Sequence, residues 1–362
     1  MLLARKLINF AANFREAPAQ SLSALAGRCL HKFWLPPRVG RLRALVRRRP
    51  LILQLETVNA CNAACIFCSY SSMQRAKGVM DLALFGKIIE DYLAMGGGAV
   101  SFTPVVGDAL LDPHLLERLS ILERFPAVDQ ITLTTNGIAL ERYRDDEVRY
   151  LLARAFCIQV SIGGLDRASY RSQYGVDRFL ETQKAMERLI RLKGELEGAA
   201  HLTFAFRTDD WNFTRRFKRE LDSYRRRGVF VSHIWSYDNY AGVVTKDVHP
   251  QLSIRENPAW KRLPCLFPSI HVAVCWDGRV TACGCVDFEC DKLAIGDAGR
   301  NTLAEICAGT RRGGILDSFA RGALAPICRD CSAYTPDSGF ARSYFKKVRP
   351  LSLEFFQQFW GG

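Results

Sequence analysis

The chain has 362 residues, with 50 lysines and arginines against 37 aspartates and glutamates, so its formal net charge is +13. At about 150 residues per domain, this length predicts two domains, or one large domain with an appendage. Because 48% of the residues are hydrophobic, wholesale disorder is excluded, and no uncharged apolar run is long enough for a transmembrane helix. The positive charge favours an anionic partner, such as a nucleotide, a phosphorylated small molecule, a nucleic acid or a lipid headgroup.

Residues 1–50 form a basic extension that we expect to be helical, because apolar residues recur there at helical spacing: Leu3, Leu7, Phe10 and Phe14. Two interpretations are open. The extension is either a helical cover packed on the main domain, which we favour, or a membrane-surface helix or substrate-facing arm. The second interpretation predicts peripheral membrane contact through this segment.

Two features concern the cellular compartment. Arg5 and Lys6 interrupt the first apolar stretch, and no small-residue cleavage site follows it, which argues against a signal peptide and predicts a cytoplasmic protein. Thirteen cysteines are many for such a protein. In a reducing compartment, ligation of a metal or cluster is the interpretation that fits them.

From residue 51, short β-like runs alternate with amphipathic helical runs. We expect strands near 51–57, 99–105, 130–135, 156–162, 201–207 and 229–235. We expect helices near 81–95, 112–124, 145–154, 177–194 and 213–226. Strands with helices between them predict a parallel sheet with right-handed crossovers.

Side chains alternate in character along these strands. Leu202, Phe204 and Phe206 share one face of the fifth strand, opposite His201 and Arg207. An open parallel sheet covered on both faces would be almost continuously apolar. The polar faces therefore predict a partial (β/α)6 TIM-like barrel with a wet concave side, whose site lies at the carboxyl ends of the strands.

The alternation of strands and helices stops at about residue 245. Residues 265–331 hold eight of the thirteen cysteines, a β-hairpin around Asp277-Gly278, and a helical run near 302–309. We therefore divide the chain into the extension at 1–50, the barrel at 51–245, a small cysteine-rich module at 246–340 and a C-terminal tail at 341–362.

Three cysteines follow the first strand at short spacings: Cys61, Cys65 and Cys68. Such spacings let a loop wrap an iron–sulfur cluster, whereas zinc sites usually close with four ligands. Three cysteine ligands on a four-iron cube leave one iron open.

This motif, its place after the first strand and the βα series resemble the radical S-adenosylmethionine (AdoMet) superfamily over about residues 51–245. The resemblance implies that the open iron chelates AdoMet and that an electron from the cluster splits it into methionine and a 5′-deoxyadenosyl radical. That radical would abstract a substrate hydrogen. The resemblance also implies an external one-electron reductant of the flavodoxin or ferredoxin kind.

Looser motifs of that family match further positions, which the resemblance makes candidates for AdoMet binding: Phe67, Gly107, Asp108, Asn136, Ser161 and Arg207. The segment Val106-Gly107-Asp108 departs from the family's Gly-Gly-Glu in two of its three residues.

The second cysteine group resembles the auxiliary-cluster region called SPASM or twitch. The shorter twitch form, with one 4Fe-4S cluster, fits the chain best and implies four ligands: Cys265, Cys283, Cys328 and Cys331. Four other cysteines of the module have no assigned role: Cys275, Cys285, Cys290 and Cys307. Of these, Cys285 and Cys290 are alternatives for one of the four ligands or for a hydrogen-atom donor. A structural zinc is the alternative for this module.

A second cluster with four protein ligands implies an electron relay, and therefore a net oxidation of the substrate. The first choice of function is dehydrogenation of a sugar-like or cyclitol-like small molecule, with an anionic group that would suit Arg207. Tyr237 and Asp238, after the sixth strand, are candidates for proton transfer. Lesser acid–base candidates lie inside the barrel: Glu56, Gln159 and His233.

Three alternatives stay open. A ribosomal-peptide (RiPP) or protein maturase is the runner-up, because the extension is too short for a separate peptide-recognition domain. An RNA-modifying radical enzyme would share the first cluster and also bind tRNA. A zinc-stabilised nucleic-acid-binding protein would explain the cysteines and the charge together and would bind in a salt-dependent way.

Overall fold

The computed structural model describes residues 49–125, 128 and 130–336. The predicted C-terminal tail and nearly all of the N-terminal extension lie outside these described residues, and with them the predicted membrane contact. None of the described helices is both long and apolar enough to cross a bilayer.

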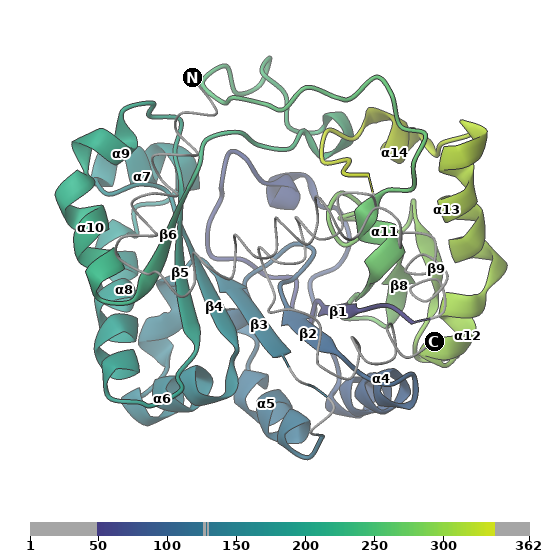
Figure 1. The fold of residues 1–362 in the computed structure, drawn as a ribbon, viewed down its shortest axis with the longest axis horizontal. Helices are drawn as coiled ribbons and strands as arrows, with labels where there is room; N and C mark the ends of the chain where they lie inside the picture. Colours follow the sequence, from purple (N-terminus) through teal and green to yellow (C-terminus); the bar gives the residue numbers. More distant parts are fainter. Residues whose placement is uncertain (1–48, 126–127, 129, 337–362) are drawn as a thin grey trace, which may run out of the picture.

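The described chain builds one nine-stranded sheet in the order β6-β5-β4-β3-β2-β1-β7-β8-β9. Its first six strands are parallel to one another. They are β1 (Ile52–Leu55), β2 (Ala99–Phe102), β3 (Gln130–Thr135), β4 (Cys157–Ile162), β5 (His201–Arg207) and β6 (Val229–Ile234). All six predicted strands are confirmed, and the sheet is an open barrel, as Figure 1 shows.

Helices cover the outer side of these strands (Figure 1). They are α4 (Leu82–Ala94), α5 (Leu115–Glu123), α6 (Asp145–Arg154), α7 (Arg167–Tyr174), α8 (Phe179–Gly194), α9 (Phe213–Arg216) and α10 (Lys218–Arg226). The predicted helices are confirmed with two differences. Helix α7 was not predicted, and the helix expected at 213–226 is divided at Phe217 into α9 and α10.

The second half of the chain extends the same sheet. Strand β7 (His271–Val274) pairs in parallel with β1, and β8 (Arg279–Thr281) and β9 (Ala294–Asp297) follow in antiparallel order. This confirms the hairpin at Asp277-Gly278. Four helices surround these strands: α11 (Leu266–Ile270), α12 (Leu303–Ala308), α13 (Thr310–Arg321) and α14 (Pro326–Asp330). One sheet therefore contains strands from both sides of the domain boundary that we predict near residue 245.

The predicted alternation of side chains holds in β5. Leu202, Phe204 and Phe206 are fully buried on the helix-covered face, whereas His201 and Arg207 on the opposite face are half-buried. A similar alternation of buried and half-buried residues runs through β3 and β4. These strands therefore leave a partly open polar surface on the concave side.

The prediction of a wet concave side is wrong at β1. Gln54 is 6% exposed, and its Nε2 atom donates to the carbonyls of Thr103 (2.9 Å) and Gly284 (3.0 Å). Glu56 is fully buried. The loop after β8 covers this part of the sheet, so the accessible part of the concave side lies toward β3, β4 and β5.

Candidate functional site

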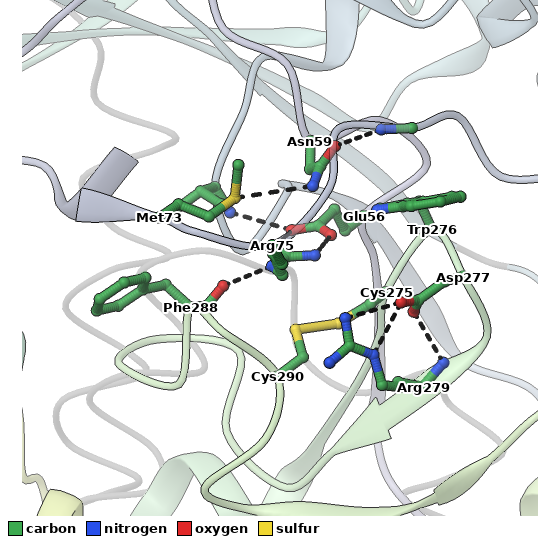
Figure 2. A network of polar contacts seen from close by, with 12 residues as sticks. Glu56, Asn59, Met73, Arg75, Cys275, Trp276, Asp277, Arg279, Phe288 and Cys290 are labelled. Carbon is green, nitrogen blue, oxygen red and sulfur yellow. Dashed lines mark hydrogen bonds and ion pairs between the residues drawn. A yellow bond between two sulfur atoms is a disulfide. The ribbon is translucent and has the colours of Figure 1, made fainter. Parts of the chain in front are cut away.

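One asparagine side chain closes the base of the loop between β1 and α4 (Figure 2). Asn59 is fully buried; it donates from Nδ2 to the Ala76 carbonyl (2.9 Å) and accepts from the Gly78 amide at Oδ1 (2.8 Å). A β-bridge between Val58 and Val79 lies beside these bonds. The closed loop carries the three cysteines of the predicted motif.

Cys61, Cys65 and Cys68 are free thiols in this loop. Burial raises the pKa of Cys65 well above its usual range, and the charges of Cys68 and Cys61 raise it further. Burial also raises the pKa of Cys61 to about 12, with the Asp108 carboxylate and Cys68 adding to the shift. Thiols that oppose one another's ionisation are close in space. This donor set fits an iron–sulfur cluster held by three cysteines, whose binding would release the thiol protons.

Two polar side chains from the barrel strands approach the cysteine loop. Asn136, directly after β3, donates from Nδ2 to Asn62 Oδ1 (2.8 Å) and lies 3.8 Å from the sulfur of Cys61. Arg207 is the last residue of β5. Burial raises the pKa of Cys68, whereas the Tyr70 backbone amide and the Arg207 guanidinium lower it. The loop and the carboxyl ends of β3 and β5 therefore meet at one site.

Arg207 is held in place from two sides. Its Nε atom donates to Ser161 Oγ (2.7 Å), which also accepts from the Tyr174 hydroxyl (2.8 Å). Its guanidinium carbon lies 5.2 Å from the centre of the Phe67 ring. Four predicted or neighbouring site residues thus form one contact network. Their arrangement fixes the Arg207 side chain at the carboxyl end of the sheet.

Tyr174 was missed as a site residue because helix α7 was not predicted. Its signals were present in the sequence: Asp166 caps the first turn through Ser169 (2.8 Å), and Gly175 ends the helix with a positive φ of 66°. The helix is short and mostly polar, so it lacks the apolar periodicity by which the other helices were predicted.

Gly107 and Asp108 lie in the segment that follows β2, where it meets the cysteine loop. The Asp108 amide donates to the Ala60 carbonyl (2.9 Å). Its buried carboxylate accepts from the Thr135 hydroxyl (2.8 Å) and from the Asn136 amide (2.6 Å). Burial raises the pKa of this carboxyl group, although these donors oppose the shift. Asp108 therefore joins the ends of β2 and β3 behind Cys61.

Tyr237 and Asp238, the predicted candidates for proton transfer, both contact other side chains. The ring of Tyr237 is 3% exposed and stacks on Phe67, with the ring centres 4.9 Å apart. Burial raises the pKa of Tyr237. The carboxylate of Asp238 pairs with Arg255 (2.9 Å). Both residues therefore have structural partners, and Tyr237 connects the segment after β6 to the cysteine loop.

The four cysteines of the second group come together from distant parts of the chain. Cys265 precedes α11, Cys283 follows β8, and Cys328 and Cys331 lie in and directly after α14; all four are buried free thiols. Burial raises the pKa of Cys328 to about 12, with Cys283 and Cys331 adding to the shift. Burial, Cys283 and Cys331 raise the pKa of Cys265 in the same way. This set of four thiols fits a closed cluster.

Two of the unassigned cysteines, Cys275 and Cys290, form a buried disulfide (Figure 2). Nothing in the sequence indicated this pair, and it departs from the expectation of reduced thiols. Cys285 is half-buried, and Cys307 is buried in α12. We leave these two outside the four-cysteine group.

Two of the three lesser acid–base candidates, Glu56 and His233, have hydrogen-bond partners. Glu56 forms a buried, two-bonded ion pair with Arg75, and it accepts from the Val106 amide (3.2 Å). Its position beside the disulfide is visible in Figure 2. His233 contacts the Thr208 carbonyl through Nε2 (3.0 Å). Gln159 is half-buried in β4.

Comparison with known proteins adds two family matches. Residues 55–195 match the Radical SAM superfamily, and residues 265–332 match SPASM, an iron–sulfur cluster-binding domain. Among curated proteins, GTP 3′,8-cyclase of Chlorobaculum tepidum is 30% identical over 156 residues, which are 43% of this chain and 44% of that protein. The GTP 3′,8-cyclase of Mannheimia succiniciproducens is 26% identical over 42% of this chain and 45% of that protein. The chain thus matches less than half the length of these relatives.

Solved structures share the fold at low sequence identity. BtrN in complex with AdoMet and 2-DOIA is 17% identical, with 83% of this chain and 98% of that chain covered and a TM-score of 0.55. SuiB of Streptococcus suis bound to precursor peptide SuiA is 13% identical, with 86% and 78% covered and a TM-score of 0.56. The anSMEcpe structure with AdoMet and Cp18Cys peptide is 16% identical, with 86% and 98% covered and a TM-score of 0.55. Residues 55–195 thus belong to the radical SAM superfamily and residues 265–332 to the SPASM family, and the two groups of free cysteines in these segments fit AdoMet chemistry with 4Fe-4S clusters.

Proposed function

We propose that this chain dehydrogenates a small hydroxylated substrate, of the sugar or cyclitol kind, by radical AdoMet chemistry. The observation that carries the proposal is the separation of seven buried or half-buried free cysteines into a group of three and a group of four. A group of three leaves one iron of a cluster open, and a group of four closes the other.

We assign the first cluster to Cys61, Cys65 and Cys68, and the second to Cys265, Cys283, Cys328 and Cys331. When bound, AdoMet and the first cluster supply a 5′-deoxyadenosyl radical that takes a hydrogen atom, and the second cluster supplies an acceptor for one electron. The substrate carbon and its hydroxyl group together lose a hydrogen atom, a proton and an electron. The product is a ketone, and the oxidation amounts to two electrons.

The residues of this chain bind and orient. The Nε atom of Arg207 donates a hydrogen bond to Ser161 Oγ. Within the described residues, the two terminal nitrogens of Arg207 have no hydrogen-bond partner. They offer a paired donor surface to a carboxylate or phosphate, so we assign Arg207 to AdoMet or to an anionic substrate group. Phe67 packs beneath it. Asn136 and Asp108 hold the loop of Cys61 against the ends of β2 and β3, with Gly107 permitting the close approach.

The candidates for proton transfer change with the geometry. Tyr237 donates toward the Ile234 carbonyl (3.4 Å), and Asp238 pairs with Arg255. We therefore give Tyr237 the role of a stacking partner for Phe67 rather than that of a base. We propose no base among the described side chains.

A peptide substrate is the second candidate, and the fold similarity to SuiB bound to precursor peptide SuiA favours it. The names of the curated relatives point instead to GTP, and the net charge of +13 suits such an anion. Dehydrogenation remains the first choice because the second group of four free thiols fits a closed cluster that would accept an electron, and BtrN, whose complex holds AdoMet and 2-DOIA, shares the fold.

The test has two arms. Iron and acid-labile sulfide are measured after anaerobic reconstitution, in the wild type and with Cys61, Cys65 and Cys68 all changed to Ala. We expect about eight of each per chain, falling to about four. About four falling to none, with zinc present, would contradict the second cluster.

In the second arm, aminocyclitols, sugar phosphates, a synthetic peptide panel and GTP are incubated with AdoMet and reductant. A product lacking two hydrogens, formed together with 5′-deoxyadenosine, supports dehydrogenation, whereas turnover of the peptides or GTP alone contradicts it.

A further inference from the structure

Lys261 is a buried lysine in the segment between β6 and α11, with only 6% of its surface exposed. Its Nζ atom lies 2.6 Å from Asn257 Oδ1 and 2.6 Å from the Cys331 carbonyl oxygen. It also lies 2.9 Å from the carbonyl oxygens of Cys328 and Arg329. All four neighbours accept hydrogen bonds, so the nitrogen is a donor throughout and the group is an ammonium ion.

This ammonium ion lacks the usual counter-charge. Within the described part of the chain, no carboxylate lies within ion-pair distance of Lys261. A buried cation costs free energy unless it is paired or hydrogen-bonded. Burial lowers the pKa of Lys261, and the charges of Cys331, Cys328, Cys265 and Asp330 oppose that shift. The direct partners of this lysine are thus the carbonyl oxygens between Cys328 and Cys331, and a cluster bound by the four cysteines would place negative charge beside it.

The contacts of Lys261 belong to a set that fixes one turn of the backbone. Asn257 donates from Nδ2 to the Arg329 carbonyl (3.0 Å), and Asn239 donates from Nδ2 to the Asp330 carbonyl (2.8 Å). With Lys261, these side chains bind every carbonyl group from residue 328 to residue 331. The segment before α11 therefore shapes the turn between two of the proposed cluster ligands.

We propose that Lys261 is a positioning residue of the second cluster site, which holds the Cys328-to-Cys331 turn and sets the reduction potential of the cluster through its positive charge. This inference rests on the proposed assignment of the second cluster. Net charge and hydrogen bonding near a cluster control its potential. A cation beside four thiolates stabilises the more negative, reduced state. Its removal should therefore make the potential more negative.

The experiment uses the full chain with Cys61, Cys65 and Cys68 changed to Ala, so that the remaining signal comes from the second cluster. Lys261→Gln and Lys261→Met are compared with Arg329→Gln, which removes one positive charge from the same turn. The Arg329 side chain is 66% exposed, so solvent and salt screen its charge. Iron content, the paramagnetic resonance spectrum and the midpoint potential are measured after reconstitution.

We expect both Lys261 variants to shift the potential to more negative values and to change the spectrum, and Arg329→Gln to leave both unchanged. Loss of iron in Lys261→Met, with an unchanged melting temperature of the iron-free chain, also supports the positioning role. Full iron and an unshifted potential in Lys261→Gln overturn the proposal. Lys261→Gln retains two donors for the carbonyl groups, so it decides the outcome if Lys261→Met does not fold.

The same measurements separate this inference from the proposed function. If the parent chain without Cys61, Cys65 and Cys68 binds no iron, the second cluster is absent and the proposed function fails. If that parent binds iron and the Lys261 variants have the same potential and spectrum as Arg329→Gln, the proposed function stands and the role of Lys261 is lost.

Discussion

At the scale of single residues, Gly107 is required by the approach of β2 to the cysteine loop. Its φ is +127°, and a Cβ atom there would lie 2.8 Å from the Val58 carbonyl oxygen and 3.0 Å from that of Ala60. We expect Gly107→Ala to lower the free energy of unfolding by about 1–3 kcal/mol and to reduce iron binding at Cys61. Chemical denaturation and iron analysis measure the two effects.

Gly86 is the matched control for that substitution, because it lies in α4 and a Cβ atom added there would meet only open space. Gly86→Ala should stabilise the chain by about 0.5–1 kcal/mol. An equal change in the free energy of unfolding in the two variants would contradict a close contact between Gly107 and the carbonyl groups of Val58 and Ala60.

Cys65 tests the three-cysteine site directly. We expect Cys65→Ala to reduce 5′-deoxyadenosine formation to background, because two cysteines cannot hold the first cluster with an open iron, and to leave the melting temperature nearly unchanged. Cys157→Ala is the control, since Cys157 lies in β4 outside both cysteine groups, with its sulfur 4.0 Å from Thr203 Oγ1. AdoMet cleavage that persists in Cys65→Ala contradicts the assignment.

Residue roles were predictable where they depend on local spacing. Cys61, Cys65 and Cys68 are close in sequence, so their pattern alone indicated a common ligand. The partners of Asp108 and Asp238 come from other elements, Thr135 from β3 and Arg255 from the segment before α11. Sequence patterns do not reveal such pairings, so the sequence did not predict the partner of either carboxylate.

At the scale of elements, α5 is anchored by a buried ion pair. Arg118 donates from Nε to Asp112 (2.8 Å), both side chains are fully buried, and Arg118 also donates to the Met80 carbonyl ahead of α4. We expect Arg118→Leu to destabilise the chain by about 3–5 kcal/mol, because Asp112 would stay buried without its cation. Urea denaturation measures the loss.

The exposed pair of Arg154 and Glu123 provides the control for that variant, with side chains 36% exposed. Arg154→Leu should cost less than about 1 kcal/mol. A similar cost for both arginine variants would contradict the account of the buried pair.

The contact between α6 and α8 should depend on pH. Hydrogen bonds from Arg191 and Arg188 lower the pKa of Asp145. A carboxyl group whose folded pKa is lowered stabilises the fold above its ordinary value of about 4, and this contribution is lost as pH falls through the lowered value. Asp145→Asn should therefore melt below the wild type at neutral pH, with a difference that shrinks in acid. A difference independent of pH contradicts this.

Elements were predictable where their hydrophobic period was regular. The six barrel strands follow from runs of alternating or apolar residues, but α13 was not expected, because Gly313 and Gly314 lie within it and are typical of loops. Tertiary contacts override that preference. Buried Arg312 donates to the carbonyls of Pro268 and Ser269, and buried Leu316 and Phe319 pack against the core.

At the scale of the whole molecule, loss of a cysteine from the first group and loss of one from the second should affect different steps of the reaction. We expect Cys328→Ala to retain 5′-deoxyadenosine formation but to lose product, because hydrogen abstraction needs only the first cluster. The measurement is the ratio of product to 5′-deoxyadenosine with the substrate found in the panel. Cys307→Ala is the control and should keep the wild-type ratio. Normal product formation in Cys328→Ala removes the electron-acceptor role.

The arrangement of the whole sheet was predictable only in part. Alternating strands and helices indicated a partial barrel, and its polar face indicated where the site lies. The pairing of β7 with β1 joins residues more than 200 positions apart, His271 with Ile52 at one end and Val274 with Leu55 at the other. No local pattern specifies such a distant partner, so the sequence predicted a second module without its place in the sheet.

That pairing has a consequence for how the chain can be divided. Strand β1 is buried along its whole length and is hydrogen-bonded on both sides. A fragment ending near residue 245 would lack β7 and would leave the backbone groups of Ile52–Leu55 as an unprotected sheet edge. Such edges pair with other chains and promote aggregation. We therefore expect a barrel fragment produced without β7 to aggregate.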